Sequence, residues 1–232
     1  MEEINKIRLN EFLEGQQKTY DKFRKNLHLV REKGVFPSNV VQDTSRGGYA
    51  ITLRHSYQIT EPLTEFSLAI SRATPAMVFD ETNAHTTVIP YEIKPNFVLD
   101  GEIIQKMLNG VHGVWNDLRT IEIDYCGWLY NQDSVIAEGY ADMGFIRTIN
   151  TLLLAISEKG IKDMGGRKAW GGFITTSRFT EPRSPKELGD FFQLMDNSPS
   201  KLGYSRPPFL DVGIVEYKAD SFTYTTIERF EF

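Results

Sequence analysis

The chain of 232 residues is 41% hydrophobic and 25% charged, and it combines a formal net charge of −5 with a single cysteine. This composition is ordinary for a globular protein that buries a core, and the acidic balance excludes a general attraction to nucleic acid or anionic membranes. One cysteine excludes an internal disulfide framework and a cysteine-based metal cluster. No apolar run reaches the ~18 residues of a membrane span, and the start "MEEINKIRLN" lacks an apolar signal sequence. We therefore expect a cytoplasmic or virion protein that is not secreted by a signal peptide and has no membrane partner.

The N-terminal residues 2–33 predict one long helix, which forms an arm (residues 1–36) beside a single α+β domain (residues 37–232). Its apolar residues are spaced alternately by four and three positions, as in the seam of a coiled coil, and Gly34 suits the position after the helix end. The seam fits either the chain's own sheet or a neighbouring subunit, and both interpretations stay open. For the second interpretation, the predicted partner-binding residues are Leu9, Leu13, Tyr20, Phe23 and Leu27.

Residues 48–94 predict a four-stranded antiparallel meander, because apolar and polar residues alternate along most of this stretch. His55 falls on the apolar face of the first strand, where a hydrogen-bonded core histidine is more common than a ligand. His28, His85 and His112 lie in separate elements, and no pair has zinc-ligand spacing. The residues expected in the core of the meander are Tyr49, Ile51, Leu53, Ile59, Phe66, Leu68 and Ile70.

The rest of the chain predicts further helices and strands in turn. Asp100 is suited to cap a helix over residues 99–118, a strand with a bulge at Gly127 follows, and another helix covers about residues 145–159. A capping box at Ser184 begins a third helix, and the strands "FLDVGIVEYKA" and "SFTYTTIERFEF" close the chain. We therefore predict an α+β fold with a mostly antiparallel sheet, built from an N-terminal meander and a C-terminal hairpin, with the long N-terminal helix and about three further helices.

The stretch "VFDETNAHTTVIPYEIK" resembles the site of Mg²⁺-dependent nucleases of the PD-(D/E)xK type, with Asp80, Glu92 and Lys94 at the matching positions. In such a site two carboxylates hold the metal, which polarises the phosphate, and the lysine orients the attacking water. Pro90 and Pro95 bracket the Glu-Ile-Lys strand, and proline favours an edge strand, whereas this nuclease family needs the strand inside its sheet. The nuclease is therefore an alternative and not the leading prediction.

The glycine-rich stretch "DMGGRKAWGGF", residues 163–173, is not a phosphate-binding loop, since it lacks Gly-Lys-Ser/Thr. It predicts either a mobile hairpin tip or a loop that becomes ordered on a partner, with Trp170 as the anchor. Cys126 has no histidine nearby in the sequence, so a small buried residue is expected there rather than a catalytic thiol. We expect no cofactor and no metal.

The strand "RTIEIDYCGWLYNQ" resembles a strand found in tail-terminator and neck proteins of contractile phages, which implies an assembled virion protein. Together with the seam helix, it makes a non-catalytic structural subunit of a larger complex the leading prediction, most concretely a virion or phage tail/neck protein. Its partners would be protein subunits, self or other, that contact the N-terminal helix and the glycine-rich loop, and we do not expect nucleic-acid binding. A second alternative, beside the nuclease, is a small-molecule binding or modifying protein with a pocket lined by Tyr49, Tyr57 and Tyr91.

Overall fold

The computed structural model describes residues 2–42, 46–161, 171–218 and 220–232, without the side chains of residues 2–9, 41 and 42. Its helices are α1 (Glu2–Lys33), α2 (Asn39–Gln42), α3 (Tyr57–Ala73), α4 (Gly101–Val114), α5 (Met143–Glu158) and α6 (Gly189–Asp196), with the 3-10 turns η1 (Trp115–Asp117) and η3 (Pro185–Glu187). Its strands are β1 (Gly47–Arg54), β2 (Ala76–Val78), β3 (Thr86–Lys94), β4 (Ile123–Tyr130), β5 (Ser134–Ala141), β6 (Ile174–Phe179), β7 (Gly203–Ser205), β8 (Phe209–Tyr217) and β9 (Phe222–Glu231). In the described part of the chain, no helix combines the length and apolarity needed to cross a membrane.

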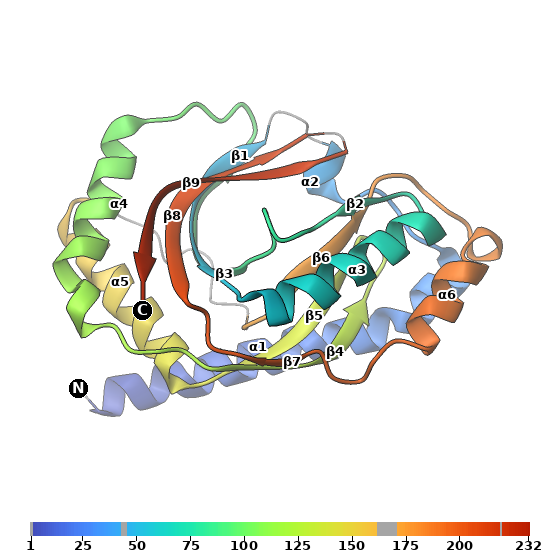
Figure 1. Ribbon diagram of the computed structural model, residues 1–232, viewed down its shortest axis with the longest axis horizontal. Coiled ribbons are helices and arrows are strands. Elements are labelled where there is room, and N and C mark those ends of the chain that lie inside the picture. The colour runs from blue at the N-terminus through green and yellow to red at the C-terminus, as the bar shows by residue number, and fades with distance from the viewer. Residues whose placement is uncertain (1, 43–45, 162–170, 219) are drawn as a thin grey trace.

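The strands form one curled sheet in the order β7-β4-β5-β6-β3-β1-β8-β9, and β2 pairs with β6 outside that path (Figure 1). The recorded pairs between these strands are antiparallel, so the predicted α+β fold with a mostly antiparallel sheet is confirmed. The two central strands share a single recorded pair, Thr86 with Ile174. The sheet therefore consists of a first half (β3, β1, β8, β9) and a second half (β6, β5, β4, β7) that separate beyond this pair.

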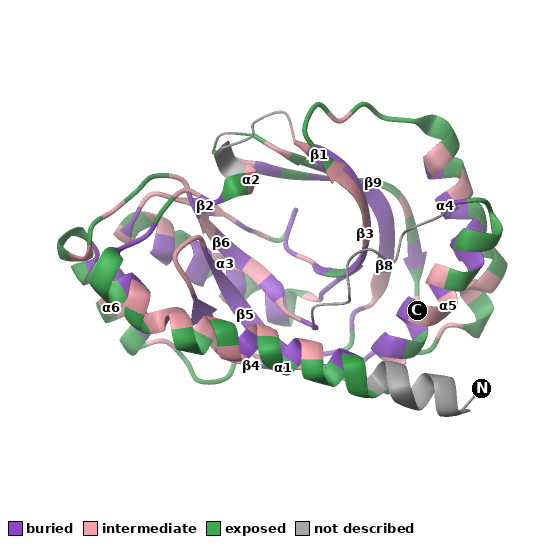
Figure 2. Ribbon diagram, turned by 180° about the vertical axis from the view of Figure 1, so that it is seen from behind, coloured by how far each residue is buried: buried purple, intermediate pink, exposed green. Residues whose placement is uncertain are grey.

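Helices cover both halves of the sheet. In the first half, α4 and α5 pack against each other, α5 contacts β3, and α4 contacts β8. In the second half, α1 and α3 lie on opposite faces, as the views from the front and from behind show (Figures 1 and 2). The segment between β2 and β3, which ends with His85, crosses the inside of the curl (Figure 1).

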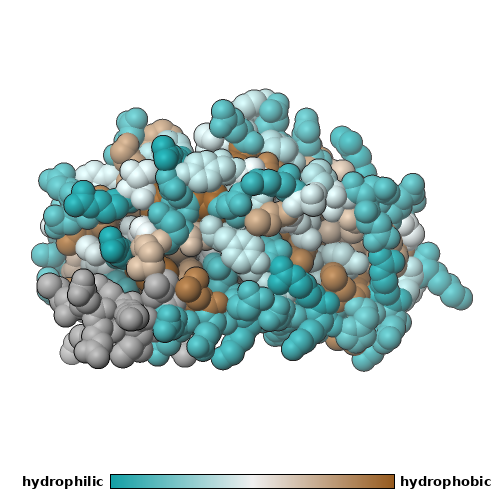
Figure 3. Space-filling view, turned by 90° about the horizontal axis from the view of Figure 1, so that it is seen from below, coloured by the Kyte–Doolittle hydropathy of each residue, from teal (hydrophilic) through white to brown (hydrophobic). Residues whose placement is uncertain are grey.

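The long N-terminal helix is confirmed over the predicted residues, and Gly34 ends it with φ of +81°. The Tyr20 side chain is fully buried, and its hydroxyl donates to the carbonyl of Gly139 in β5. Arg24 forms an ion pair with Glu138 of the same strand. These contacts attach α1 to the chain's own sheet, and the outward face along α1 is mostly hydrophilic with scattered apolar residues (Figure 3).

The predicted meander is wrong in its middle, because residues 57–73 form helix α3 instead of strands. Alternation by two and spacing by three and four coincide here, and the helical spacing of Ile59, Leu63, Phe66 and Ile70 places these four side chains on one buried face. Leu68, expected in the core, lies on the outer face and is 38% exposed. The other predicted core residues, Tyr49, Ile51, Leu53, Ile59, Phe66 and Ile70, are buried.

Most of the remaining predicted elements are confirmed. The Asp100 side chain accepts from the backbone N–H of Glu102 and caps α4, and the register of β4 shifts at Gly127, as expected of a bulge. The capping box at Ser184 is present, and β8 pairs with β9 as the closing hairpin. Strand β5 was not predicted, although it is the neighbour of β6 at the centre of the second half.

Candidate functional site

Two histidines lie at the junction between the halves of the sheet. His55 directly follows β1 and His85 directly precedes β3, and these two strands pair with each other. Burial lowers the pKa of both imidazoles, to about 3 for His55 and to about 4 for His85, and the positive charge of Arg54 acts in the same direction on each. Both rings are therefore neutral near pH 7.

The His55 ring is bonded at both nitrogens. Nδ1 lies 2.8 Å from the Ser205 hydroxyl, and Nε2 lies 3.0 Å from the Thr86 hydroxyl and 3.2 Å from that of Tyr125. Hydroxyl groups donate or accept, so this network satisfies a neutral ring in either tautomer. The sequence-based expectation of a hydrogen-bonded core histidine at His55 is confirmed, and the side chain joins β1 to β3, β4 and β7.

The His85 ring is bonded at one nitrogen. Nδ1 lies 2.7 Å from the backbone carbonyl oxygen of Asn83. A carbonyl only accepts, so we assign the proton of the neutral ring to Nδ1, which leaves the lone pair on Nε2. The residues that the structure describes provide no hydrogen-bond partner for Nε2, and the side chain is partly exposed. The ring can therefore accept a proton at Nε2.

The Asn83 carbonyl that holds His85 is itself fixed in place. The Asn83 side chain accepts from the backbone N–H of Asp80 at 3.0 Å and donates to the carbonyl of Phe222 at 3.1 Å. The His85 ring stacks on Phe222, with 5.5 Å between the ring centroids, and lies 5.4 Å from Tyr224. Strand β9 and the turn before β3 thus set the orientation of the imidazole.

Arg54, at the end of β1, brings a buried positive charge to this place. Its Nη2 donates to the carbonyls of Glu81 and Thr82, at 2.8 and 2.7 Å, and its Nε lies 3.8 Å from the Asp211 carboxylate. Burial lowers the pKa of the guanidinium, and the Asp211 charge opposes that shift. Nη1 is buried without a hydrogen-bond partner among the described residues, so this guanidinium keeps an unused donor.

Asp211 is fully buried and is neutralised mainly by a different arginine. Arg229 donates to both carboxylate oxygens at 2.8 Å, in the bidentate geometry that gives the strongest pairing, and the Thr226 hydroxyl adds a third bond at 2.9 Å. Because Asp211 is already paired, the longer contact to Arg54 leaves much of the Arg54 charge available to a ligand. Tyr224 lies beneath Arg54, whose guanidinium is 5.6 Å from the ring centroid.

Arg178 reaches the same group of residues from β6, in the other half of the sheet. Its Nη1 donates to the Ser38 hydroxyl at 3.1 Å, while its Nε is buried without a partner in the described part of the chain. The guanidinium lies 6.0 Å from the Tyr217 ring centroid, and Tyr217 contacts the Phe222 ring that stacks on His85. The charge of Arg178 also contributes to the lowered pKa of His85.

We refer to His85, Arg54, Arg178, Asp211 and Tyr224 as the His85 site. The site combines a neutral imidazole, whose Nε2 has no hydrogen-bond partner among the described residues, with Arg54, which contacts Asp211 only at 3.8 Å, and Arg178, which has no carboxylate partner in the described part of the chain. Thr87, two residues after His85 in β3, is on the same side of the strand by the two-residue period and is exposed. The chemistry that this combination supports is proton abstraction beside a bound anion.

The candidate nuclease residues are used for local contacts. Asp80 accepts from the backbone N–H and the hydroxyl of Thr82, at 2.9 and 2.6 Å. Glu92 pairs with Lys94 at 2.6 Å, at the far end of β3 from Asp80. Among the described residues no group of three histidine, cysteine or acidic side chains could hold a metal ion, so the nuclease interpretation has no metal site there.

The candidate partner-binding residues of α1 differ in exposure. Leu13 is 44% exposed, Tyr20 is fully buried, and Phe23 and Leu27 are partly buried against hydrophobic clusters of the same chain. The side chain of Leu9 and the whole of Trp170 lie outside the described residues. Whether these residues bind a partner stays a prediction.

Of the residues in the His85 site, only His85 entered the sequence analysis, where it was noted for its lack of zinc spacing. The others were not identified. A signal for two of them does exist, since Arg54 and Arg178 each interrupt an otherwise apolar or hydroxyl-rich strand, "AITLRH" and "FITTSRF". A charged residue inside such a strand is costly to bury unless it is paired or functional, which makes both arginines candidates.

Of the comparisons with known proteins, the one with solved structures gives matches. No family model matches the chain, and no curated protein matches it. Among solved structures, TT0787 of Thermus thermophilus has a TM-score of 0.56 at 17% identity, covering 80% of this chain and 97% of that one. LigT of E. coli, solved in complex with 3′-AMP, has a TM-score of 0.46 at 11% identity, and the match covers 81% of this chain and 98% of LigT. ATU0111 of Agrobacterium tumefaciens str. C58, described as a conserved protein of unknown function, has a TM-score of 0.48 at 9% identity, and the match covers 78% of this chain and 85% of ATU0111.

These comparisons correct the leading functional prediction. A non-catalytic structural subunit, and a virion or phage tail/neck protein in particular, is contradicted, because the solved structure that the fold matches over 80% of this chain and 97% of that one is TT0787. The resemblance of "RTIEIDYCGWLYNQ" to a phage strand was misleading, since alternating strands of this kind occur in many antiparallel sheets. At 17% identity the likeness to TT0787 establishes the fold, and the chain has the fold of that protein over most of its length.

Proposed function

We propose that the chain is a phosphoesterase that acts on a phosphodiester at the His85 site. The observation that carries the proposal is a neutral, oriented imidazole whose Nε2 has no hydrogen-bond partner in the described part of the chain, in a group that also contains Arg54 and Arg178. Guanidinium groups bind phosphate oxygens through paired N–H donors, and a neutral histidine is the commonest general base of enzymes. The sequence-based inclination toward a non-enzyme is replaced by this proposal.

In the proposed reaction, Nε2 of His85 accepts a proton from a water molecule, and the water oxygen attacks the phosphorus. The bond from phosphorus to the leaving oxygen breaks, and the imidazolium returns its proton to that oxygen. The products are a phosphomonoester and an alcohol. The guanidinium groups of Arg54 and Arg178 stabilise the negative charge on the phosphoryl oxygens in the transition state.

The geometry favours a phosphodiester over a carboxylic ester because of the two cations. A phosphodiester carries a negative charge before the reaction, and this charge increases on the non-bridging oxygens as the nucleophile approaches. The buried donors Nη1 of Arg54 and Nε of Arg178 lack partners among the described residues, and such donors are costly to leave unbonded. A bound phosphoryl group would supply their acceptors.

The test is hydrolysis by the purified protein of a panel comprising a phosphodiester, a phosphomonoester and a carboxylic ester that share one chromogenic leaving group. Dinucleotides and 2′,3′-cyclic nucleotides extend the phosphodiester arm, with 3′-AMP as a trial inhibitor because LigT was crystallised with it. We expect turnover of the phosphodiesters, and a fall in kcat/KM by about 100-fold in Arg178→Ala, as for the loss of one donor to a transition-state oxyanion.

Arg72→Ala is the matched control, because Arg72 is an exposed arginine in the last turn of α3. It should retain the wild-type rate. No turnover of any phosphodiester by folded wild-type protein would reject the proposal, and so would an Arg178→Ala variant as active as Arg72→Ala.

A further inference from the structure

A separate cavity lies beside α5, in the helical layer of the first half. It has a volume of about 240 Å³ and is lined by Asp117, Leu118, Arg119, Arg147, Thr148 and Thr151. Pockets for drug-sized molecules begin at roughly 300 Å³, and one water takes about 30 Å³ of the liquid. The cavity therefore suits a group that is larger than a water and smaller than a whole nucleotide.

Thr148 marks this cavity as a polar site. The side chain is 1% exposed, and its hydroxyl has no hydrogen-bond partner among the described residues. A threonine inside a helix usually donates to the carbonyl four residues earlier, but this hydroxyl makes no such bond. Buried polar groups are normally bonded, so this hydroxyl keeps an unused donor at the wall of the cavity.

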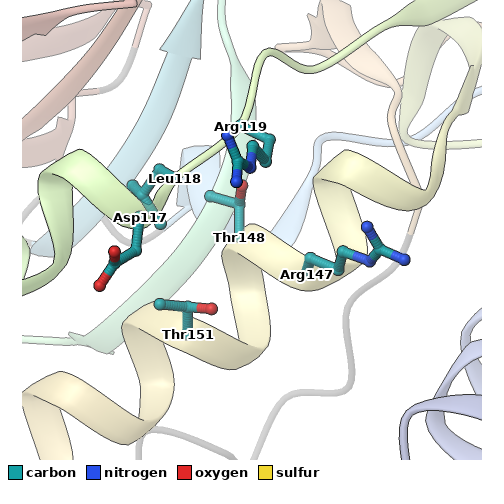
Figure 4. Close-up of a pocket in the computed structure, with 6 residues that line it drawn as sticks. All are labelled: Asp117, Leu118, Arg119, Arg147, Thr148 and Thr151. Atoms are coloured by element: carbon teal, nitrogen blue, oxygen red, sulfur yellow. The ribbon is translucent and has the colours of Figure 1, made fainter. Parts of the chain in front are cut away.

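The charges around the cavity favour an anion. Neither Arg119 nor Arg147 forms an ion pair with a carboxylate in the described part of the chain, whereas most other arginines there do. Figure 4 shows Arg119 and Thr148 directed toward one another, while the side chains of Asp117 and Arg147 extend to opposite sides. The one carboxylate of the lining thus points away from the position between Arg119 and Thr148.

We propose that this cavity binds a phosphate group, as free phosphate or as the end of a phosphomonoester. Arg119 donates from its guanidinium fork, the hydroxyls of Thr148 and Thr151 donate from α5, and Arg147 adds positive charge at the rim. A tetrahedral oxyanion has enough acceptors for all of these donors, and arginine pairs with phosphate through two parallel bonds. The site is formed by the last residue of η1, the two residues after it and α5, and it shares no residue with the His85 site.

The test is calorimetric titration of the full chain with inorganic phosphate, and in a second arm with AMP, against sodium chloride of equal ionic strength. We expect phosphate binding by the wild type and a rise in Kd of at least ~10-fold in Arg119→Ala and in Thr148→Val, the size expected for loss of a charge-assisted bond. Binding of both ligands through Arg119 indicates a nucleotide phosphate, and binding of phosphate alone indicates the free ion.

Thr148→Val is the sharper variant, because it keeps the shape of the side chain and removes only the hydroxyl. Its melting temperature without phosphate should equal or exceed that of the wild type, since the lost hydroxyl has no partner among the described residues. Arg72→Ala is the control and should bind phosphate as the wild type does.

The proposal is overturned if the wild type does not bind phosphate beyond the salt control, or if Arg119→Ala and Thr148→Val bind it unchanged. It is also overturned if His85→Gln removes phosphate binding while these two variants keep it, because the phosphate then occupies the His85 site. Loss of phosphodiester hydrolysis, in contrast, tests only the proposed function.

Discussion

His55, which is buried, and His85, which is partly exposed, are two neutral histidines at one junction, and they differ in what their second nitrogen contacts. The hydroxyls of Ser205, Thr86 and Tyr125 occupy both nitrogens of His55. Among the described residues, His85 is held by Nδ1 alone, and its Nε2 remains available beside Arg54 and Arg178. A lowered pKa is therefore shared by a structural and a candidate catalytic histidine. The unoccupied lone pair, and not the pKa, distinguishes the two.

Among the tests of this difference, replacing each histidine by glutamine should have the largest effect. We expect His85→Gln to lower kcat for phosphodiester hydrolysis by ~10²–10⁴-fold, the usual contribution of a general base. His55→Gln should keep kcat near the wild-type value when the rate is expressed per folded molecule, because this ring does not reach the reacting atoms. Rates measured at neutral pH, with the folded fraction taken from circular dichroism, check both values. Equal losses in the two variants would remove the distinction between the histidines.

For stability the order of the two positions should be reversed, with the larger loss in the alanine variant of His55. His55→Ala leaves a cavity and unpairs the ring-facing hydroxyls, so we expect the free energy of unfolding to fall by roughly 3–5 kcal/mol. His85→Ala removes a partly exposed ring with one hydrogen bond, so we expect the free energy of unfolding to fall by about 1–2 kcal/mol. Urea denaturation of both variants gives the comparison. A larger loss in His85→Ala would mean that His85 is the structural histidine.

The pH dependence of stability follows from the same two rings. The pKa of each histidine is lower in the folded chain, at about 3 and about 4, than the ordinary value of 6.5. The unfolded chain therefore binds protons first as the pH falls below 6.5, and the free energy of unfolding decreases until the folded pKa is reached. At pH 5 each ring accounts for a loss of about 2 kcal/mol.

Denaturation midpoints measured between pH 7 and pH 4 check this expectation, with the glutamine variants as controls. Each variant should lose less stability on acidification than the wild type does, because glutamine does not titrate. A wild-type stability that is constant over this range would contradict the lowered pKa of the two imidazoles in the folded chain.

Much of the fold could be predicted from the sequence where one periodicity dominates. The helix α1 and the closing hairpin β8–β9 were predicted correctly. Strand β1 was predicted only in part, because it ends at Arg54 and its residues are buried on both faces instead of alternating between core and solvent. Residues 57–73 satisfied two periods at once, and the helix was missed because burial of Ile59, Phe66 and Ile70 fits a strand as well.

The His85 site could not be predicted in the same way, because its members come from β1, β6, β8, β9 and the turn before β3. They meet because the sheet order brings β6 beside β3 and then β1, β8 and β9. Local periodicity carries no information about that order. The strand arginines Arg54 and Arg178 were the one local signal. The sequence analysis instead placed its alternative catalytic site at Asp80, Glu92 and Lys94.

The substitution with the smallest expected effect, Tyr125→Phe, is the most specific test of the hydroxyl network around His55. The Tyr125 hydroxyl lies 2.7 Å from Thr86 and 3.2 Å from Nε2 of His55, and the residue is fully buried. Tyr125→Phe removes this hydroxyl without changing the ring, and Thr86 remains as a partner for His55. We therefore expect a loss of about 1 kcal/mol in unfolding free energy, the typical net value of one hydrogen bond.

The matched change on the other side of the junction is Tyr224→Phe, because the Tyr224 ring contacts His85. The Tyr224 hydroxyl lies 3.3 Å from the carbonyl oxygen of Ala50 and 3.2 Å from the carbonyl oxygen of Asp211. Stability should again fall by about 1 kcal/mol. Activity should respond in this variant and not in Tyr125→Phe, since Tyr224 packs between Arg54 and His85. Parallel unfolding curves and phosphodiester rates for the two variants decide the point. An activity loss confined to Tyr125→Phe would place the reaction at the His55 network and reverse the assignment of the two histidines.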